Sequence, residues 1–154
     1  MITFGEQYLL QAIHSEIIAR DLYAKLSDRV KSEKGKAVMN AMAKEEDKHH
    51  TILAERYKSL SGKEYIYDPN IKAGPDYSFL EESVFGYTQV MEALKLALGV
   101  ELDSVRFYSK LVKTTSDPKD KKTLKKLVKF EESHKKILKH EIKTLEKTNH
   151  WNLK

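Results

Sequence analysis

The chain of 154 residues is long enough to bury one continuous core, and we expect a single domain over residues 1–154. With 33% charged residues, three prolines and six glycines, the composition favours helix, so we expect an all-α protein. The absence of cysteine excludes disulfides, thiol catalysis and cysteine-held metal centres. Neither a secretion signal nor a membrane-length apolar run is evident, which predicts a cytoplasmic protein without a membrane partner.

The net charge of +5 raises the question of a nucleic-acid partner. The lysines are spread along the expected helix surfaces with acids between them, apart from a cluster from Lys119 to Lys129. This distribution indicates a solvated lysine-rich surface, and we do not expect nucleic acid as a partner.

Two helices are predicted in the first part of the chain, over about residues 4–31 and 33–60. Thr3 and Glu6 have the spacing of a capping box, and Ser32 is placed to cap the second helix, which is expected to end at Ser61-Gly62. Each helix has an inner stripe of apolar residues at steps of three and four. Acidic and imidazole groups interrupt these stripes at Glu16, Glu46 and His49.

The helical periodicity lapses over about residues 61–86, where Asp68-Pro69-Asn70 and Gly74-Pro75-Asp76 are typical of turns. A connection of this length is expected when a chain crosses from one end of a four-helix bundle to the other. We also consider a short helical turn over about 79–84.

Two more helices are predicted over about residues 87–113 and 118–147, with Asp117-Pro118 as the start of the last one. Their inner stripes are again apolar, and they are again interrupted by acids and an imidazole. These are Glu101 in the third helix and Glu131 and His134 in the fourth.

A shift of 85 residues superimposes the two halves of the sequence without a gap, with 13 identities over the 49 pairs from 9/94 to 57/142. Most identities lie on the inner stripes. The matched polar pairs are Glu16 with Glu101, Tyr23 with Tyr108, Glu46 with Glu131, and His49 with His134. The chain is therefore predicted to be a duplicated helical hairpin.

Four ionised glutamates in one apolar core would repel one another and lose their hydration. Two divalent cations would balance them, and each ion could take one His, one terminal Glu and two shared Glu. This predicts metal ligands at Glu16, Glu46, His49, Glu101, Glu131 and His134. Oxygen and imidazole ligands without thiolate favour iron or manganese, with zinc as a redox-silent alternative.

Other polar residues are less clearly assigned by the repeat. Tyr23 and Tyr108 follow their glutamates by seven residues, and two readings stay open for them: a hydrogen bond to a ligand carboxylate, or filling of the core beside the site. The unmatched histidines are interpreted as surface residues: His14, His50, His140 and His150. Arg20 and Arg56 are left out of the site because Val105 and Glu141 stand at the matching positions.

A Glu on the first and third helices, E-x-x-H on the second and fourth, and a Tyr seven residues after each unpaired Glu resemble the ferritin-like di-iron carboxylate superfamily. KEE-x-x-H is most similar to its rubrerythrin branch. The resemblance covers about residues 5–147 and implies a ferritin-like four-helix bundle, built from two duplicated hairpins joined by a long crossover. It also implies a stand-alone bundle, because the four-cysteine rubredoxin module is missing, and Ser104 replaces a further Glu that rubrerythrins carry.

The resemblance implies a non-haem di-iron, or dimanganese, peroxidase or oxidase in which the six ligands act through bound metals. Hydrogen peroxide or dioxygen would be reduced with electrons from an external donor such as a rubredoxin-like protein, and Glu46 and Glu131 would bridge the metals. A homodimer is expected from the resemblance alone. The alternatives are a ferroxidase or iron-handling protein like the mini-ferritins, and a non-catalytic bundle that binds zinc or no metal.

Overall fold

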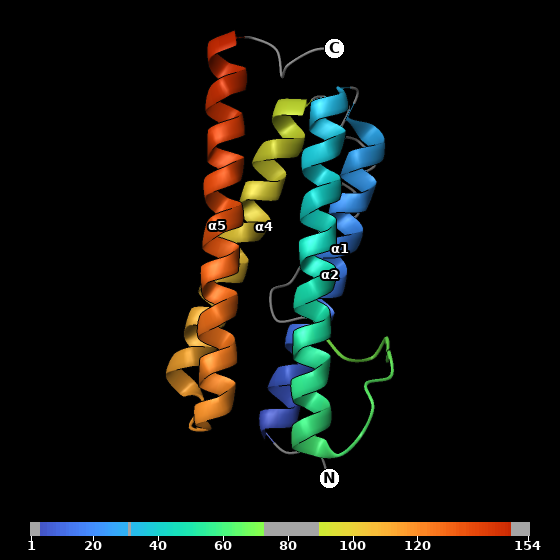
Figure 1. Cartoon of the computed structure of the whole chain (residues 1–154), viewed down its shortest axis with the longest axis vertical. Coiled ribbons are helices and arrows are strands. Elements are labelled where there is room, and N and C mark those ends of the chain that lie inside the picture. The colour runs from blue at the N-terminus through green and yellow to red at the C-terminus, as the bar shows by residue number, and fades with distance from the viewer. Residues whose placement is uncertain (1–3, 31, 73–89, 149–154) are drawn as a thin grey trace.

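The computed structural model describes residues 4–30, 32–72 and 90–148. Four long helices make up most of this part of the chain, as the composition predicted. They are α1 (Phe4–Arg29), α2 (Glu33–Ser61), α4 (Val90–Thr114) and α5 (Pro118–Thr148). Figure 1 shows α1 beside α2 and α4 beside α5, so the bundle consists of two helical hairpins, and the predicted fold class is confirmed.

The long connection is needed because the ends that it joins lie at opposite ends of the bundle. In Figure 1, α1 and α5 run upward while α2 and α4 run downward, so the chain leaves α2 at the bottom and enters α4 at the top. Residues 73–89 of this connection are outside the described residues, and so are the helical turn considered over 79–84, Thr3 and His150.

Local signals at the helix ends behave as the sequence predicted. The Ser32 hydroxyl accepts a hydrogen bond from the Gly35 N–H at 2.9 Å, which caps α2. Gly62 ends α2 with φ of 73°, a conformation that favours glycine, and its N–H donates to the Lys58 carbonyl. The Asp117 carboxylate accepts from two backbone N–H groups of the first turn of α5 at 2.8 and 3.2 Å. The first helix ends two residues earlier than expected, at Arg29.

The core consists of two apolar clusters along the length of the bundle. One gathers Leu22, Leu26, Met39, Leu94 and Leu138 with their neighbours. The other is formed chiefly by the following buried residues: Leu9, Ile13, Leu53, Leu111 and Leu127. Along every helix, the polar residues of the inner stripe fall between the residues of these two clusters. A layer of buried acids and imidazoles therefore separates two blocks of hydrocarbon.

Leu98 and Val105 stand at steps of three and four residues from Glu101 in the apolar stripe of α4, but they are only half-buried. Instead, Val100 and Ser104 are buried on α4, at 2% and 6% exposure. Ser104 is the counterpart of Ala19 at the shift of 85 residues, and both are buried, so the buried face of α4 follows that of α1 at this position.

Candidate metal centre

The four helices bring six acidic and imidazole side chains to the middle of the bundle. Each helix contributes one glutamate, and α2 and α5 each add a histidine one turn further on. The six are Glu16, Glu46, His49, Glu101, Glu131 and His134, and none exposes more than 4% of its surface. Carboxylates and imidazoles are rarely buried so completely unless they are paired or bind a metal.

One set of these side chains surrounds His49. Its Nδ1 lies 3.4 Å from Glu16 Oε2, 3.3 Å from Glu46 Oε2 and 3.3 Å from Glu131 Oε1. One ligand atom from each of these four residues lies within 4.8 Å of all the others. Three helices, α1, α2 and α5, thus meet at one cation-sized position.

A second set surrounds His134. Its Nδ1 lies 3.0 Å from Glu46 Oε1, 3.3 Å from Glu101 Oε1 and 3.3 Å from Glu131 Oε2. These four residues also bring one ligand atom each within the same 4.8 Å limit. Glu46 and Glu131 belong to both sets and direct one oxygen toward each histidine, which is how a carboxylate bridges two ions.

The unpaired polar atoms of this layer show that the residues fit two cations. Among the described residues, the buried atoms without a hydrogen-bond partner include one or more atoms of each of the six side chains. Each Nδ1 has three carboxylate oxygens at nearly equal distances, although a single N–H can be directed well at only one of them. Buried polar atoms almost always have partners. The nitrogen and oxygen atoms of these six side chains converge and leave ligand positions free. This combination of donor atoms suits a pair of metal ions bridged by carboxylates.

Two tyrosines tie the hairpins together beside this layer. The Tyr23 hydroxyl donates to Glu101 Oε1 and the Tyr108 hydroxyl donates to Glu16 Oε1. Each tyrosine thus bonds the glutamate of the other hairpin, and not the one seven residues before it. Of the two readings left open, the hydrogen bond to a candidate ligand carboxylate is the one the structure shows, although both side chains also pack in the core clusters.

Without cations, the charges of the layer are balanced by retained protons. Burial and the Glu16 carboxylate raise the pKa of Glu46 to about 8, and burial with the charges of Glu46 and Glu16 raises the pKa of Glu131 well above its usual range. Burial alone would lower the pKa of His49, but the three carboxylates around it outweigh this effect and raise it to about 12. Metal binding at neutral pH must therefore displace protons.

Glu16, in contrast, is held as a carboxylate, and the two tyrosines are held as phenols. Burial opposes ionisation of Glu16, yet the nearby Glu46 and His49 side chains and the hydrogen bond donated by Tyr108 outweigh burial and lower its pKa. The phenols themselves stay protonated, because burial and the neighbouring carboxylates raise the pKa of both Tyr23 and Tyr108 well above the usual value. Each phenol is therefore a fixed hydrogen-bond donor at any ordinary pH.

The interpretation of His14 as a surface residue was wrong. His14 is 4% exposed, its Nε2 lies 3.1 Å from the Tyr65 hydroxyl, and its ring stacks on Tyr67 with 5.2 Å between centroids. His50 is half-buried against the same Tyr65 ring. Both histidines are covered by the segment after α2, and the periodicity of a helix cannot show that a following segment folds back over it.

The other excluded residues lie away from the candidate ligands. His140 is exposed on α5. Arg20 pairs with Asp21 and with Asp47, at 3.1 Å in each case. Arg56 pairs with Asp117 and Asp120 at the start of α5, where it joins the two hairpins.

Among the described residues, no helix is both long enough and apolar enough to cross a membrane.

Three solved structures share this fold over nearly their whole length. A hypothetical protein from Pyrococcus furiosus is 25% identical, with a TM-score of 0.72 and coverage of 91% of this chain and 89% of that one. An uncharacterised conserved protein from Magnetospirillum magnetotacticum is 20% identical, with a TM-score of 0.71 and coverage of 93% and 95%. A dodecameric thioferritin, the bacterioferritin-related protein from Bacteroides fragilis, is 16% identical, with a TM-score of 0.71 and coverage of 97% and 90%.

No curated protein sequence shows significant similarity to the chain. The family model for rubrerythrin, in contrast, matches residues 7–142, which include both hairpins and all six candidate ligands. This match and the two overlapping carboxylate and histidine sets support a di-iron protein. The chain belongs to the rubrerythrin family.

Proposed function

We propose that the chain is a non-haem di-iron oxidoreductase that reduces hydrogen peroxide, or dioxygen, with electrons from an external donor. The observation that carries the proposal is that Glu46 and Glu131 are shared by two buried ligand sets, each with its own histidine. A single structural ion would need only one set. Membership of the rubrerythrin family supports the choice of iron and of peroxide.

Under this proposal, His49 and Glu16 would hold one ion, His134 and Glu101 would hold the other, and the two shared glutamates would contribute to both. Two reduced iron ions bound there would supply the two electrons that, with two protons, reduce one hydrogen peroxide to two molecules of water. The protein residues fix where this occurs. The phenol of Tyr108 holds Glu16 in place, Tyr23 does the same for Glu101, and the apolar clusters on either side exclude bulk water.

Two features of the sequence shape the proposal. These 154 residues contain no cysteine to hold a rubredoxin-type iron, so under the proposal the electrons come from a donor outside them. Ser104 is buried one turn after Glu101, where rubrerythrins carry a further glutamate. A neutral hydroxyl at this position lacks the charge and the second oxygen of a carboxylate, so the proposal assigns Glu101 alone as the ligand from α4.

The test begins with metal analysis of protein purified from its own source, followed by anaerobic reduction and addition of peroxide. We expect two iron ions per chain, and optical oxidation of the centre that consumes one peroxide per two electrons. Turnover should continue when a reductant is supplied. Protein that contains only zinc or no metal, stays folded and does not react with peroxide would refute the proposal.

A ferroxidase or iron-handling function is the second candidate, and the fold shared with the dodecameric thioferritin favours testing it. That protein forms a dodecamer, and we propose that this chain also forms an oligomer, with a homodimer as the expected size. Light scattering of the purified protein distinguishes a dimer from a shell. A shell that takes up many iron ions per chain and oxidises Fe²⁺ faster than it turns over peroxide would favour the second candidate.

A further inference from the structure

The positive charge of the protein is concentrated on one helix. Helix α5 contains eleven lysines and five acids, a net charge of +6, whereas the whole chain has +5, so the other residues together carry −1. Ten of these lysines are exposed, whereas Glu146 is the only exposed acid among the described residues of α5. The exposed lysines are Lys119, Lys121, Lys122, Lys125, Lys126, Lys129, Lys136, Lys139, Lys143 and Lys147.

The acids of α5 do not neutralise this surface. Asp120 is buried and bonded to Arg56, Glu131 is in the candidate metal centre, and Glu132 is paired with Lys135 at 2.6 Å. In the part of the chain that the structure describes, Lys135 is the only lysine of α5 with an ion-pair partner within 4.0 Å. The exposed lysines form a solvated surface, as the sequence indicates, but the shortage of exposed acids extends beyond the cluster from Lys119 to Lys129; we call the outer face of α5 the lysine face.

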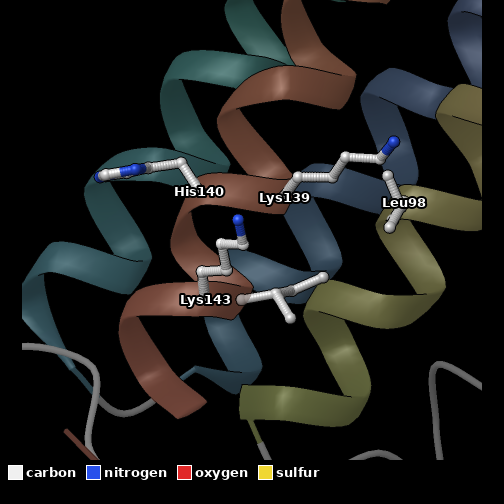
Figure 2. Close-up of a pocket in the computed structure, with 5 residues that line it drawn as sticks. Leu98, Lys139, His140 and Lys143 are labelled. Atoms are coloured by element: carbon white, nitrogen blue, oxygen red, sulfur yellow. The ribbon is translucent and has the colours of Figure 1, made fainter. Parts of the chain in front are cut away.

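A hollow of about 430 Å³ adjoins the lysine face between α4 and α5. It is lined by Leu98, Lys139, His140, Ile142 and Lys143. Figure 2 shows Lys139 extending from α5 toward Leu98 on α4, with His140 pointing to the other side. Leu98 and Ile142 are half-buried and pack against the core. The surface thus combines an apolar floor with a cationic rim, the usual arrangement of a protein interface.

We propose that the lysine face and this hollow dock a small protein with an acidic contact surface, which delivers electrons to the metal centre. The inference rests on the proposed function, because that function needs an external donor. Glu131 and His134 project inward from the same helix, so a partner on its outer face is separated from them by roughly one helix diameter, about 10–12 Å. Leu98 precedes Glu101 by one turn on α4 and Lys139 follows His134 by about one and a half turns on α5, so the hollow lies over the apolar cluster next to the centre.

The features of the surface favour a protein over nucleic acid or a membrane. All the cations of α5 are lysines and none is arginine, whereas base and phosphate recognition favour the planar fork of arginine. A surface that enters a bilayer needs exposed aromatic or large apolar side chains. Among the described residues of the lysine face, only Ile137 is of this kind, at 43% exposure. An apolar floor beside the lysines fits a side chain of an acidic protein, and long-range attraction would speed its association.

The test compares two double variants with the same change in charge. Lys139→Glu/Lys143→Glu alters the lysine face beside the hollow, and Lys44→Glu/Lys63→Glu alters exposed lysines of the other hairpin. A fluorescently labelled rubredoxin of net negative charge is the probe, and its Kd is measured by anisotropy at low and physiological salt. All the chains compared are loaded with zinc, so this readout does not depend on any redox activity.

We expect the first double variant to bind the probe about tenfold or more weakly and to lose most of the salt dependence, because steering by clustered charges changes association by about 10 to 1,000-fold. The matched control should stay within about twofold of the wild type. Equal weakening by both double variants, or no weakening by either, would overturn the proposal. So would tighter binding of a short DNA duplex or of acidic phospholipid vesicles through the same two lysines.

Electron delivery is then measured with iron-loaded protein by stopped-flow oxidation of the reduced probe in the presence of peroxide. The first double variant should be slow with the protein probe and normal with a small neutral reductant. A normal rate with the probe would overturn the docking proposal. If every chain is inactive with both reductants while probe binding still depends on Lys139 and Lys143, the proposed peroxide reduction fails and the docking surface stands.

Discussion

The energetic cost of burying Glu46 without a cation can be measured with the substitution Glu46→Gln in metal-free protein. The pKa of Glu46 rises from an ordinary value of 4.5 to about 8 in the folded chain. Between these pH values, the folded state holds a proton that the unfolded chain has released. The free energy of unfolding therefore falls as pH rises through this window.

The size of the effect follows from the two pKa values. At about 1.4 kcal/mol for each pKa unit, the contribution of Glu46 falls by roughly 3 kcal/mol between pH 5 and pH 8. The raised pKa values of Glu131 and His49 act in the same direction, and because Glu46 contributes to both shifts, its replacement should also weaken their pH dependence. An amide side chain at this position has no proton to lose, so the Glu46→Gln variant should gain about this amount relative to wild type over the same interval.

The assay is urea unfolding followed by circular dichroism in the presence of a chelator, at several pH values from 5 to 8. Glu45→Gln is the matched control, because a hydrogen bond from Lys48 lowers the pKa of Glu45 and its carboxylate is ionised throughout this range. Parallel pH profiles for wild type and Glu46→Gln would refute the reasoning. With metal bound, the order should reverse, because the amide replaces one of the two ligand oxygens of Glu46 with an NH2 group and removes the negative charge that both ligand sets share.

Three further predictions concern the metals and the helix caps. Glu131→Ala should reduce metal occupancy severely, measured by elemental analysis, whereas His140→Ala should leave it unchanged, and equal occupancy would contradict the ligand assignment. Tyr108→Phe removes the hydrogen bond to Glu16, so metal affinity measured by chelator competition should fall about 10 to 100-fold while the circular dichroism spectrum is kept. Ser32→Ala should lower the free energy of unfolding by about 1 kcal/mol through loss of a cap, and an unchanged urea midpoint would refute this role.

Much of the fold could be predicted because the duplicated pattern is strong. Apolar periodicity located the helices, and Ser32, Gly62 and Asp117 marked ends that the structure reproduces. The shift of 85 residues also selected six polar residues that the structure brings together, although each E-x-x-H alone would be weak evidence.

The contacts that depend on the arrangement of the hairpins could not be predicted. Residue spacing within one helix places Tyr23 on the same face as Glu16, but only the packing of the two hairpins shows that it bonds Glu101 instead. The buried position of His14 depends on Tyr65 and Tyr67, which belong to a segment without periodicity. Site residues were selected because the same residue type recurs 85 positions later. This selection overlooks any functional residue that is present in only one half of the chain.

The crossed contacts between the hairpins bear on how the chain arose. The contacts that close the centre run from one half to the other: His49 with Glu131, His134 with Glu46, Tyr23 with Glu101, and Tyr108 with Glu16. A lone ancestral hairpin would build such a centre only by pairing with a second copy of itself about a two-fold axis. Gene fusion of the two copies would then free each half to evolve separately, as at His14, which now has Gly99 as its counterpart.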